Sequence, residues 1–293
     1  MRLVIVHGIN NENSAPAEVE ASWMRALRGA WERDGLDPIS DLKITTAYYA
    51  DELAKLSSRP RDAVAAGAGS AVSQVEFELL QEYAAAAGIT QRDIVAAAEE
   101  GGLNVSAVQA GLPHEAWLIA TSQALEHILP TQGKYIARMF LRQAAIYVER
   151  KGVQNRIKAI VRDKMFEDDT PIVVVAHSLG TVVAYELLTE PVAAGKNVPL
   201  FCTLGSPLAV GIIANHVGKR RTFPRPPIEK WINGADREDF VTLGRILSRE
   251  TIGFDGILNI DRIINPESDK HDISAYLSER SISSAVHAAL CAA

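Results

Sequence analysis

Apolar and polar positions follow two alternating patterns along most of the chain. Residues 3–6 form an uninterrupted apolar run that ends at His7-Gly8. Such a run is typical of a strand buried on both faces of a parallel sheet. Residues 16–33 then carry apolar side chains at helical spacing, and a Thr- and Tyr-rich stretch at 43–49 predicts a second strand. A strand, a helix and a strand in this order indicate the start of an α/β fold.

The second half of the chain repeats the alternation. Two helical stretches occupy 134–165, and apolar runs predict strands at 172–175, 199–204 and 230–232. Helices are expected at 181–188 and, at the end of the chain, near 272–290. We therefore predict a single α/β domain over residues 1–293, with a mostly parallel sheet covered by helices on both faces.

Residues 60–130 interrupt the alternation, because alanine is dense there and β-branched runs are scarce. The spacing predicts helices near 72–87, 91–100, 104–111 and 114–128. The last of them carries an apolar stripe of Trp117, Leu118, Ile119, Leu125 and Ile128. This stripe must be buried against something. The insertion is therefore either a cap over a functional site or an extension of the outer helical layer, and the sequence leaves both open.

A candidate nucleophile follows the strand at 172–175, within Ala176-His177-Ser178-Leu179-Gly180. A sharp turn between a buried strand and a helix exposes a serine oxygen at the helix N-terminus, and it needs small residues two positions away on each side. Gly180 meets this need, and Ala176 stands where glycine is usual. This context predicts that Ser178 is a nucleophile.

A serine nucleophile needs a histidine base and a carboxylate that orients the base. In proteins with this type of turn, the acid and then the histidine follow the serine along the chain. The histidines after Ser178 are His216, His271 and His287. His216 leaves too little room for an acid-bearing strand and His287 falls within the closing helix, so His271 is favoured. It lies on a loop after Asn265-Pro266-Glu267-Ser268.

For the acid, Asp236, Glu238 and Asp239 crowd one loop after the strand at 230–232. Asp239 is favoured because the apolar pair after it can anchor the loop, and Asp236 stays the alternative. An oxyanion hole needs two backbone N–H donors. We expect Leu179 to supply one, and Ile9 or Asn10, after His7-Gly8, to supply the other.

These motifs resemble bacterial α/β-hydrolases of the serine lipase and esterase type. The pattern comprises Val6-His7-Gly8, Val175 to Thr181, Thr203-Leu204-Gly205-Ser206-Pro207, Trp231-Ile232-Asn233 with Asp239, and His271 with Tyr276. The resemblance covers residues 1–55 and 135–280 but not the insertion. It implies hydrolysis of a small-molecule ester or lipid-like substrate through an acyl-enzyme, with no metal and no organic cofactor.

Charge and composition narrow the choice of partners. The formal net charge is −6, and the one dense basic cluster, Lys219-Arg220-Arg221, lies beside prolines and is expected to be a solvated loop. We therefore expect no nucleic-acid partner. Without a long apolar segment or a signal sequence we expect no integral membrane segment and a cytoplasmic protein, and the two cysteines, Cys202 and Cys291, fit a reducing compartment.

Other functions stay open on the sequence. A thioesterase, an amidase or an acyltransferase would use the same three residues. A hydrolase fold that has lost activity and serves as a binding module is an alternative outside the enzymes. The natural substrate, its acyl length and the oligomeric state are not encoded in these motifs.

Overall fold

The computed structural model describes residues 1–293 except 10, 13, 58–72, 112–113, 129–130 and 293, and describes only the backbone at 128 and 131–139. Six parallel strands form one sheet in the order β2-β1-β3-β4-β5-β6. They are β1 (Arg2–Val6), β2 (Lys43–Thr46), β3 (Ile172–His177), β4 (Val198–Leu204), β5 (Ile228–Asp236) and β6 (Ile257–Ile263). The molecule is therefore an α/β protein with an all-parallel sheet, as the apolar runs predict.

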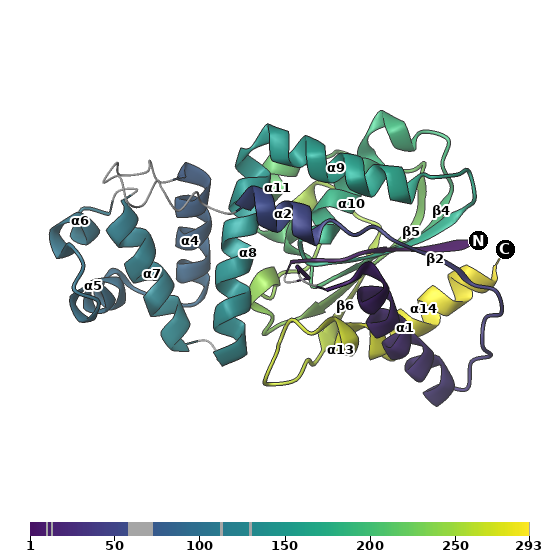
Figure 1. Ribbon diagram of the computed structural model, residues 1–293, viewed down its shortest axis with the longest axis horizontal. Helices are drawn as coiled ribbons and strands as arrows, with labels where there is room; N and C mark the ends of the chain where they lie inside the picture. Colours follow the sequence, from purple (N-terminus) through teal and green to yellow (C-terminus); the bar gives the residue numbers. More distant parts are fainter. Residues whose placement is uncertain (10, 13, 58–72, 112–113, 129–130, 293) are drawn as a thin grey trace.

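Helices cover both faces of this sheet (Figure 1). The strand residues alternate between two apolar clusters: Leu3 and Ile5 belong to one and Val4 and Val6 to the other. This two-residue period is the pleat of a strand that is buried on both sides. One face packs on α1 (Pro16–Arg33), α13 (Ile273–Ser278) and α14 (Arg280–Cys291). The other face packs on α9 (Lys151–Met165) and α10 (Leu179–Thr189), and α2 (Ala50–Ser57), α8 (Thr131–Glu149) and α11 (Gly211–Val217) lie next to these two helices.

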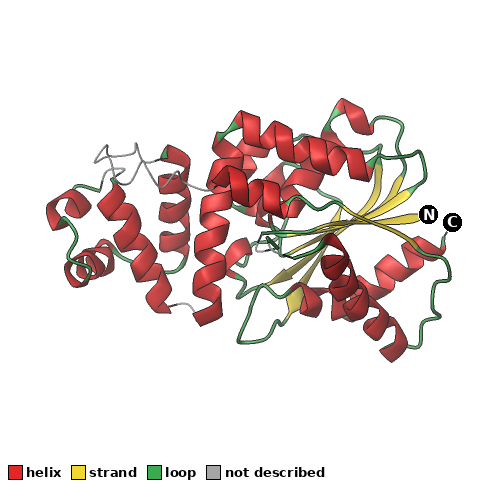
Figure 2. Cartoon of the chain, viewed as in Figure 1, coloured by secondary structure: helices red, strands yellow, loops and turns green. Residues whose placement is uncertain are grey.

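The insertion forms four helices beyond the carboxyl ends of the strands (Figures 1 and 2). They are α4 (Gln74–Ala86), α5 (Gln91–Glu100), α6 (Val105–Gln109) and α7 (Glu115–Ile128). All four helices predicted from spacing are confirmed. Their buried side chains, such as Tyr83 and Trp117, join the same apolar cluster as strand residues Val4 and Val174. One core therefore runs from the sheet into the insertion.

Several elements differ from the expectation. The strand at 43–49 ends at Thr46, because the backbone N–H of Tyr49 bonds to the His7 ring and α2 starts at Ala50. The closing helix is divided at Glu279, whose carboxylate caps α14. Strand β6 was not expected, since its partly exposed sequence mixes polar and apolar residues.

The apolar stripe of α7 is only partly buried. Trp117, Leu118 and Leu125 are buried as expected. Ile119 is 40% exposed, so the prediction that it belongs to the buried stripe is wrong. The side chain of Ile128 lies outside the described residues. Trp117 packs inside the insertion against Phe77, with ring centroids 4.4 Å apart. Truncating Trp117 would therefore act first on the packing of α4 and α7.

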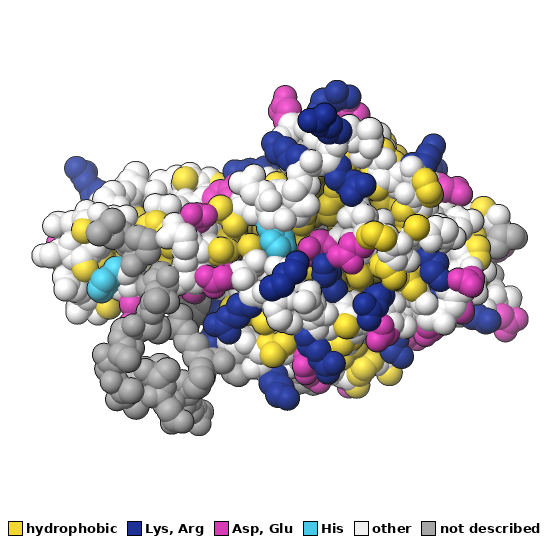
Figure 3. Space-filling model, turned by 90° about the horizontal axis from the view of Figure 1, so that it is seen from above, with side chains coloured by type: hydrophobic (Ala, Val, Ile, Leu, Met, Phe, Trp, Pro, Cys, Tyr) yellow, Lys and Arg dark blue, Asp and Glu magenta, His cyan; other side chains and the backbone are white. Residues whose placement is uncertain are grey.

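The surface carries charges of both signs. On the face shown in Figure 3, Lys and Arg side chains are interspersed with Asp and Glu. Over the described part of the chain, no helix combines the length and the apolarity needed to cross a bilayer.

Candidate active site

Ser178 occupies a strained turn between β3 and α10. Its φ of 55° and ψ of −133° are unfavourable for a residue with a Cβ. Its N–H donates to Leu204 O at 3.0 Å, which ties the turn to the end of β4. A Cβ at Gly180 would lie 2.2 Å from His7 O, so only glycine lets β1 approach this turn. The predicted sharp turn between a buried strand and a helix is therefore present at Ser178.

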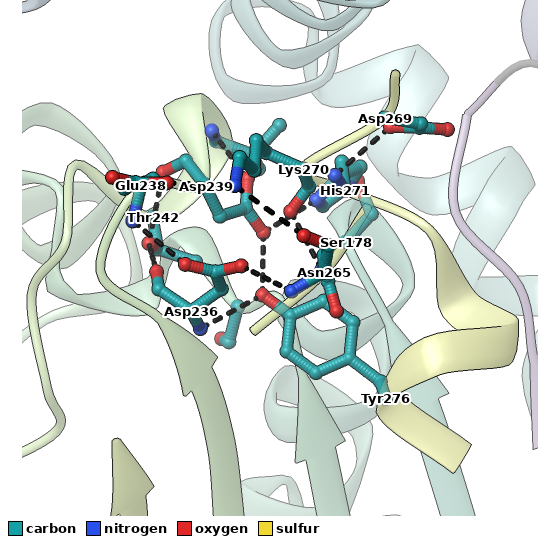
Figure 4. Close-up of polar contacts among 12 residues, drawn as sticks. Ser178, Asp236, Glu238, Asp239, Thr242, Asn265, Asp269, Lys270, His271 and Tyr276 are labelled. Atoms are coloured by element: carbon teal, nitrogen blue, oxygen red, sulfur yellow. Dashed lines mark hydrogen bonds and ion pairs between the residues drawn. The ribbon is translucent and has the colours of Figure 1, made fainter. Parts of the chain in front are cut away.

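His271 and Asp239 are in direct contact (Figure 4). His271 Nδ1 lies 2.7 Å from Asp239 Oδ2, and both side chains are buried. Tyr276 also donates its hydroxyl to Oδ2 at 2.7 Å, and the N–H of Val241 donates to Oδ1 at 2.8 Å. Burial and the charge of Asp239 raise the pKa of Tyr276 well above its ordinary value, so it stays a neutral donor. These contacts hold the carboxylate in one orientation toward the imidazole.

Asp236, the alternative acid, has a different role in the structure. Its carboxylate accepts the backbone N–H groups of Glu238 at 2.8 Å and Asn265 at 2.7 Å. It thereby joins the loop after β5 to the loop after β6, which carries His271 (Figure 4). The fold thus places Asp239 rather than Asp236 against His271.

His271 also lies next to the serine turn. Its ring faces that of His177, with centroids 4.3 Å apart and an interplanar angle of 31°. A Cβ on Gly205 would be 2.8 Å from His271 Cε1, and Gly205 follows the residue that binds the Ser178 N–H. Ser178 Oγ and His271 Nε2 are both buried and have no hydrogen-bond partner among the described residues. Buried polar atoms are normally paired, and a catalytic role is one of the reasons for which such an atom stays unpaired.

His177 is a member of this cluster that the sequence reasoning did not single out. Burial and the neighbouring His271 lower its pKa well below the ordinary value, so it stays neutral. Its ring is nearly perpendicular to that of Trp23, with centroids 6.4 Å apart, and its Nε2 is buried without a partner in the described residues. Its position directly before the serine was the only hint available in the sequence.

The expected oxyanion donors flank Ser178. Leu179 is the first residue of α10, where backbone N–H groups lack intrahelical partners. On the other side, a Cβ on Gly8 would lie 2.4 Å from Ser178 Cβ and 3.1 Å from Oγ. Ile9 follows Gly8 and is buried, whereas Asn10 lies outside the described residues. The segment after β1 and the start of α10, which are expected to supply the two donors, therefore meet at Ser178.

His7 holds the segment after β1 in place. Its Nδ1 lies 2.7 Å from Gly8 O and its Nε2 accepts the Tyr49 N–H at 3.0 Å, which fits one neutral tautomer. The Tyr49 ring stacks on it, with centroids 4.4 Å apart, and the Tyr49 hydroxyl donates to His7 O. Burial lowers the pKa of His7 to about 4, and the hydrogen bond to Gly8 O offsets only part of this decrease.

This lowered pKa predicts acid sensitivity of the fold. Between pH 6.5 and about 4 the unfolded chain binds a proton at His7 that the folded protein does not, so stability falls as the pH drops through this window. The loss is on the order of 3 kcal/mol in the free energy of unfolding. Urea unfolding at several pH values measures it. His7→Asn should reduce this slope and leave the part due to His177. An unchanged slope in His7→Asn would contradict the assignment.

The remaining histidines after Ser178 lie elsewhere. His216 lies on α11, with Nε2 3.5 Å from Glu186 Oε1, and His287 Nε2 contacts Asp37 O at 2.7 Å. Neither approaches Asp239 among the described contacts. The described residues contain no group of three or more His, Cys, Asp or Glu side chains arranged to hold a metal ion.

Comparison of the chain with models of protein families gives no match, and comparison with curated proteins and with solved structures gives no significant similarity.

Proposed function

We propose that this protein is a serine hydrolase of the α/β-hydrolase fold that cleaves carboxylic esters through an acyl-enzyme on Ser178. One observation carries most of the weight: a His271–Asp239 contact of 2.7 Å lies beside a strained serine whose hydroxyl is unpartnered among the described residues. The chain order agrees as well, with the serine after β3, the acid after β5 and the histidine after β6.

The chemistry would follow the roles of a serine, a histidine and an acid. Ser178 Oγ attacks the ester carbonyl while His271 Nε2 takes its proton. Asp239 accepts the Nδ1–H of His271, which fixes the tautomer and stabilises the imidazolium. His271 then protonates the departing alcohol, and a water molecule that it deprotonates releases the acid from Ser178.

The negative charge that develops on the carbonyl oxygen needs donors that are already in place. The N–H of Leu179, at the start of α10, and the N–H of Ile9 are the proposed donors. Gly8 supports this role because its missing side chain lets the segment before Ile9 touch Ser178. His7 and Tyr49 fix that segment through the contacts described above.

A fluorophosphonate probe tests the proposal without knowledge of the substrate. It should label the folded protein at one position, and mass spectrometry of the digested protein should place the label on Ser178. The Ser178→Ala variant is the matched control and should stay unlabelled. Folded protein without labelling would contradict an enzymatic role and favour a binding module.

A panel of p-nitrophenyl esters of graded chain length then tests the substrate class. We expect hydrolysis of some member, with the preferred chain length set by the space around Ser178. Labelling by the phosphonate without hydrolysis of any ester would contradict the esterase assignment and direct attention to thioesters or amides.

A further inference from the structure

Helix α4 of the insertion contacts the loop that carries Asp239. Tyr83 lies in the last turns of α4 and is fully buried. Its hydroxyl donates to Val241 O at 2.7 Å, and its ring packs against Phe240 with centroids 4.5 Å apart. Phe240 and Val241 are the apolar pair directly after Asp239. The apolar pair that the sequence suggested as an anchor for this loop therefore contacts the insertion.

Val241 links this contact to the acid. Its carbonyl accepts the Tyr83 hydroxyl, while its N–H donates to Asp239 Oδ1 at 2.8 Å. The other carboxylate oxygen faces His271 at 2.7 Å. A shift of Val241 would therefore rotate the carboxylate away from the imidazole. Burial and the charge of Asp239 raise the pKa of Tyr83 well above its ordinary value, so the hydroxyl keeps its proton.

A second contact fixes α4 beside Tyr83. The Glu82 carboxylate accepts the N–H groups of Gly211 at 2.8 Å and Ile212 at 3.3 Å, and it pairs with the Arg245 guanidinium. Arg245 also donates to Ala209 O at 3.3 Å. Arg245 lies further along the segment between β5 and β6, and Gly211 begins α11. Glu82 thus joins α4 both to α11 and to the far end of the loop that carries Asp239.

We propose that the helical insertion positions the catalytic acid, with Tyr83 holding Asp239 in line with His271 through Val241. This inference rests on the proposed function for its catalytic meaning. Tyr83 does not contact the reacting atoms and is a positioning residue. The insertion then acts on the chemistry through the acid loop, whether or not it also roofs the substrate.

Tyr83→Phe tests the inference because it removes only the hydroxyl and leaves the ring on Phe240. We expect kcat to fall roughly 10-fold, the effect of one misaligned buried hydrogen bond, with KM unchanged. Tyr185→Phe is the matched control. Tyr185 is also a buried tyrosine, its ring packs on Trp231 and its hydroxyl has no partner among the described residues, so its loss should leave kcat unchanged.

A second readout needs no substrate. The proton between His271 Nδ1 and Asp239 should give a downfield proton NMR resonance, assigned by its loss in His271→Gln. Tyr83→Phe should move or broaden this resonance, and Tyr185→Phe should not. If Tyr83→Phe fails to fold, Glu82→Gln takes its place, with a smaller change in the same direction expected.

The outcomes separate the two proposals. A folded Tyr83→Phe protein with unchanged kcat and an unchanged resonance overturns the positioning role while esterase activity stands. A shifted resonance in a protein that neither hydrolyses esters nor binds the phosphonate overturns the proposed function, while the link from Tyr83 to Asp239 stands.

Discussion

Alanine at position 178 is expected to lower ester hydrolysis by at least about 10⁴-fold, because the acyl acceptor is lost and only the oxyanion donors and substrate binding remain. Stability should not fall with it. The Ser178 hydroxyl has no partner among the described residues, so its removal breaks no hydrogen bond there. Alanine keeps the Cβ and hence the backbone strain at a φ of 55°. Steady-state kinetics and urea unfolding measure the two effects.

Ser283→Ala provides the control for this result. Ser283 is another fully buried serine, on α14, and its hydroxyl donates only to Arg280 O of its own helix in the described structure. This variant should keep wild-type activity. Retention of more than about a tenth of the activity in Ser178→Ala would show that the nucleophile is another group.

Asparagine at position 239 is the second large effect. We expect kcat to fall by about 10⁴-fold, the scale for losing the carboxylate that fixes the histidine tautomer. The amide fills the same space, but it carries no charge to stabilise the imidazolium. It also cannot accept all three hydrogen bonds now made by His271, Tyr276 and Val241. Steady-state kinetics on an active ester measure the loss.

Asp236→Asn is the matched control, since it makes the same change at the end of β5, just before the loop that carries Asp239. Its carboxylate binds two backbone N–H groups and no part of His271 in the described contacts. We expect a loss of about 1–2 kcal/mol in the free energy of unfolding, typical of one weakened buried hydrogen bond, and less than a 10-fold change in kcat. A larger kinetic loss in Asp236→Asn than in Asp239→Asn would transfer the role of the acid to Asp236.

The two carboxylates have different partners at the carboxyl end of the sheet. Asp236 joins the loops after β5 and β6, whereas Asp239 meets the histidine that the second loop carries. Tyr276 contacts both, because its hydroxyl accepts the Asp236 N–H at 3.0 Å and donates to Asp239. Both variants should therefore lose stability, because each weakens buried hydrogen bonds, whereas turnover should respond mainly to Asp239.

The sequence by itself determined the elements whose physics is local. The runs at 3–6 and 172–175 are apolar throughout because both faces of their strands are covered. The helices of the insertion were predictable because side-chain spacing and caps such as Thr90 act within a few residues. The turn at Ser178 was predictable from consecutive residues, since an apolar strand, a serine and a helix follow one another there, although the need for glycine at 180 comes from the distant backbone of His7.

Only the tertiary structure decided what depends on neighbours distant in the chain. Asp236 and Asp239 are the same type of residue, three positions apart. They differ in their hydrogen-bond partners, which depend on how the loops after β5 and β6 pack together. Strand β6 was missed because an edge strand is half exposed and its sequence need not be apolar. The contact of Tyr83 with Val241 joins residues 158 positions apart. No local pattern records such a contact, because its partners are selected by how the helices pack on the sheet.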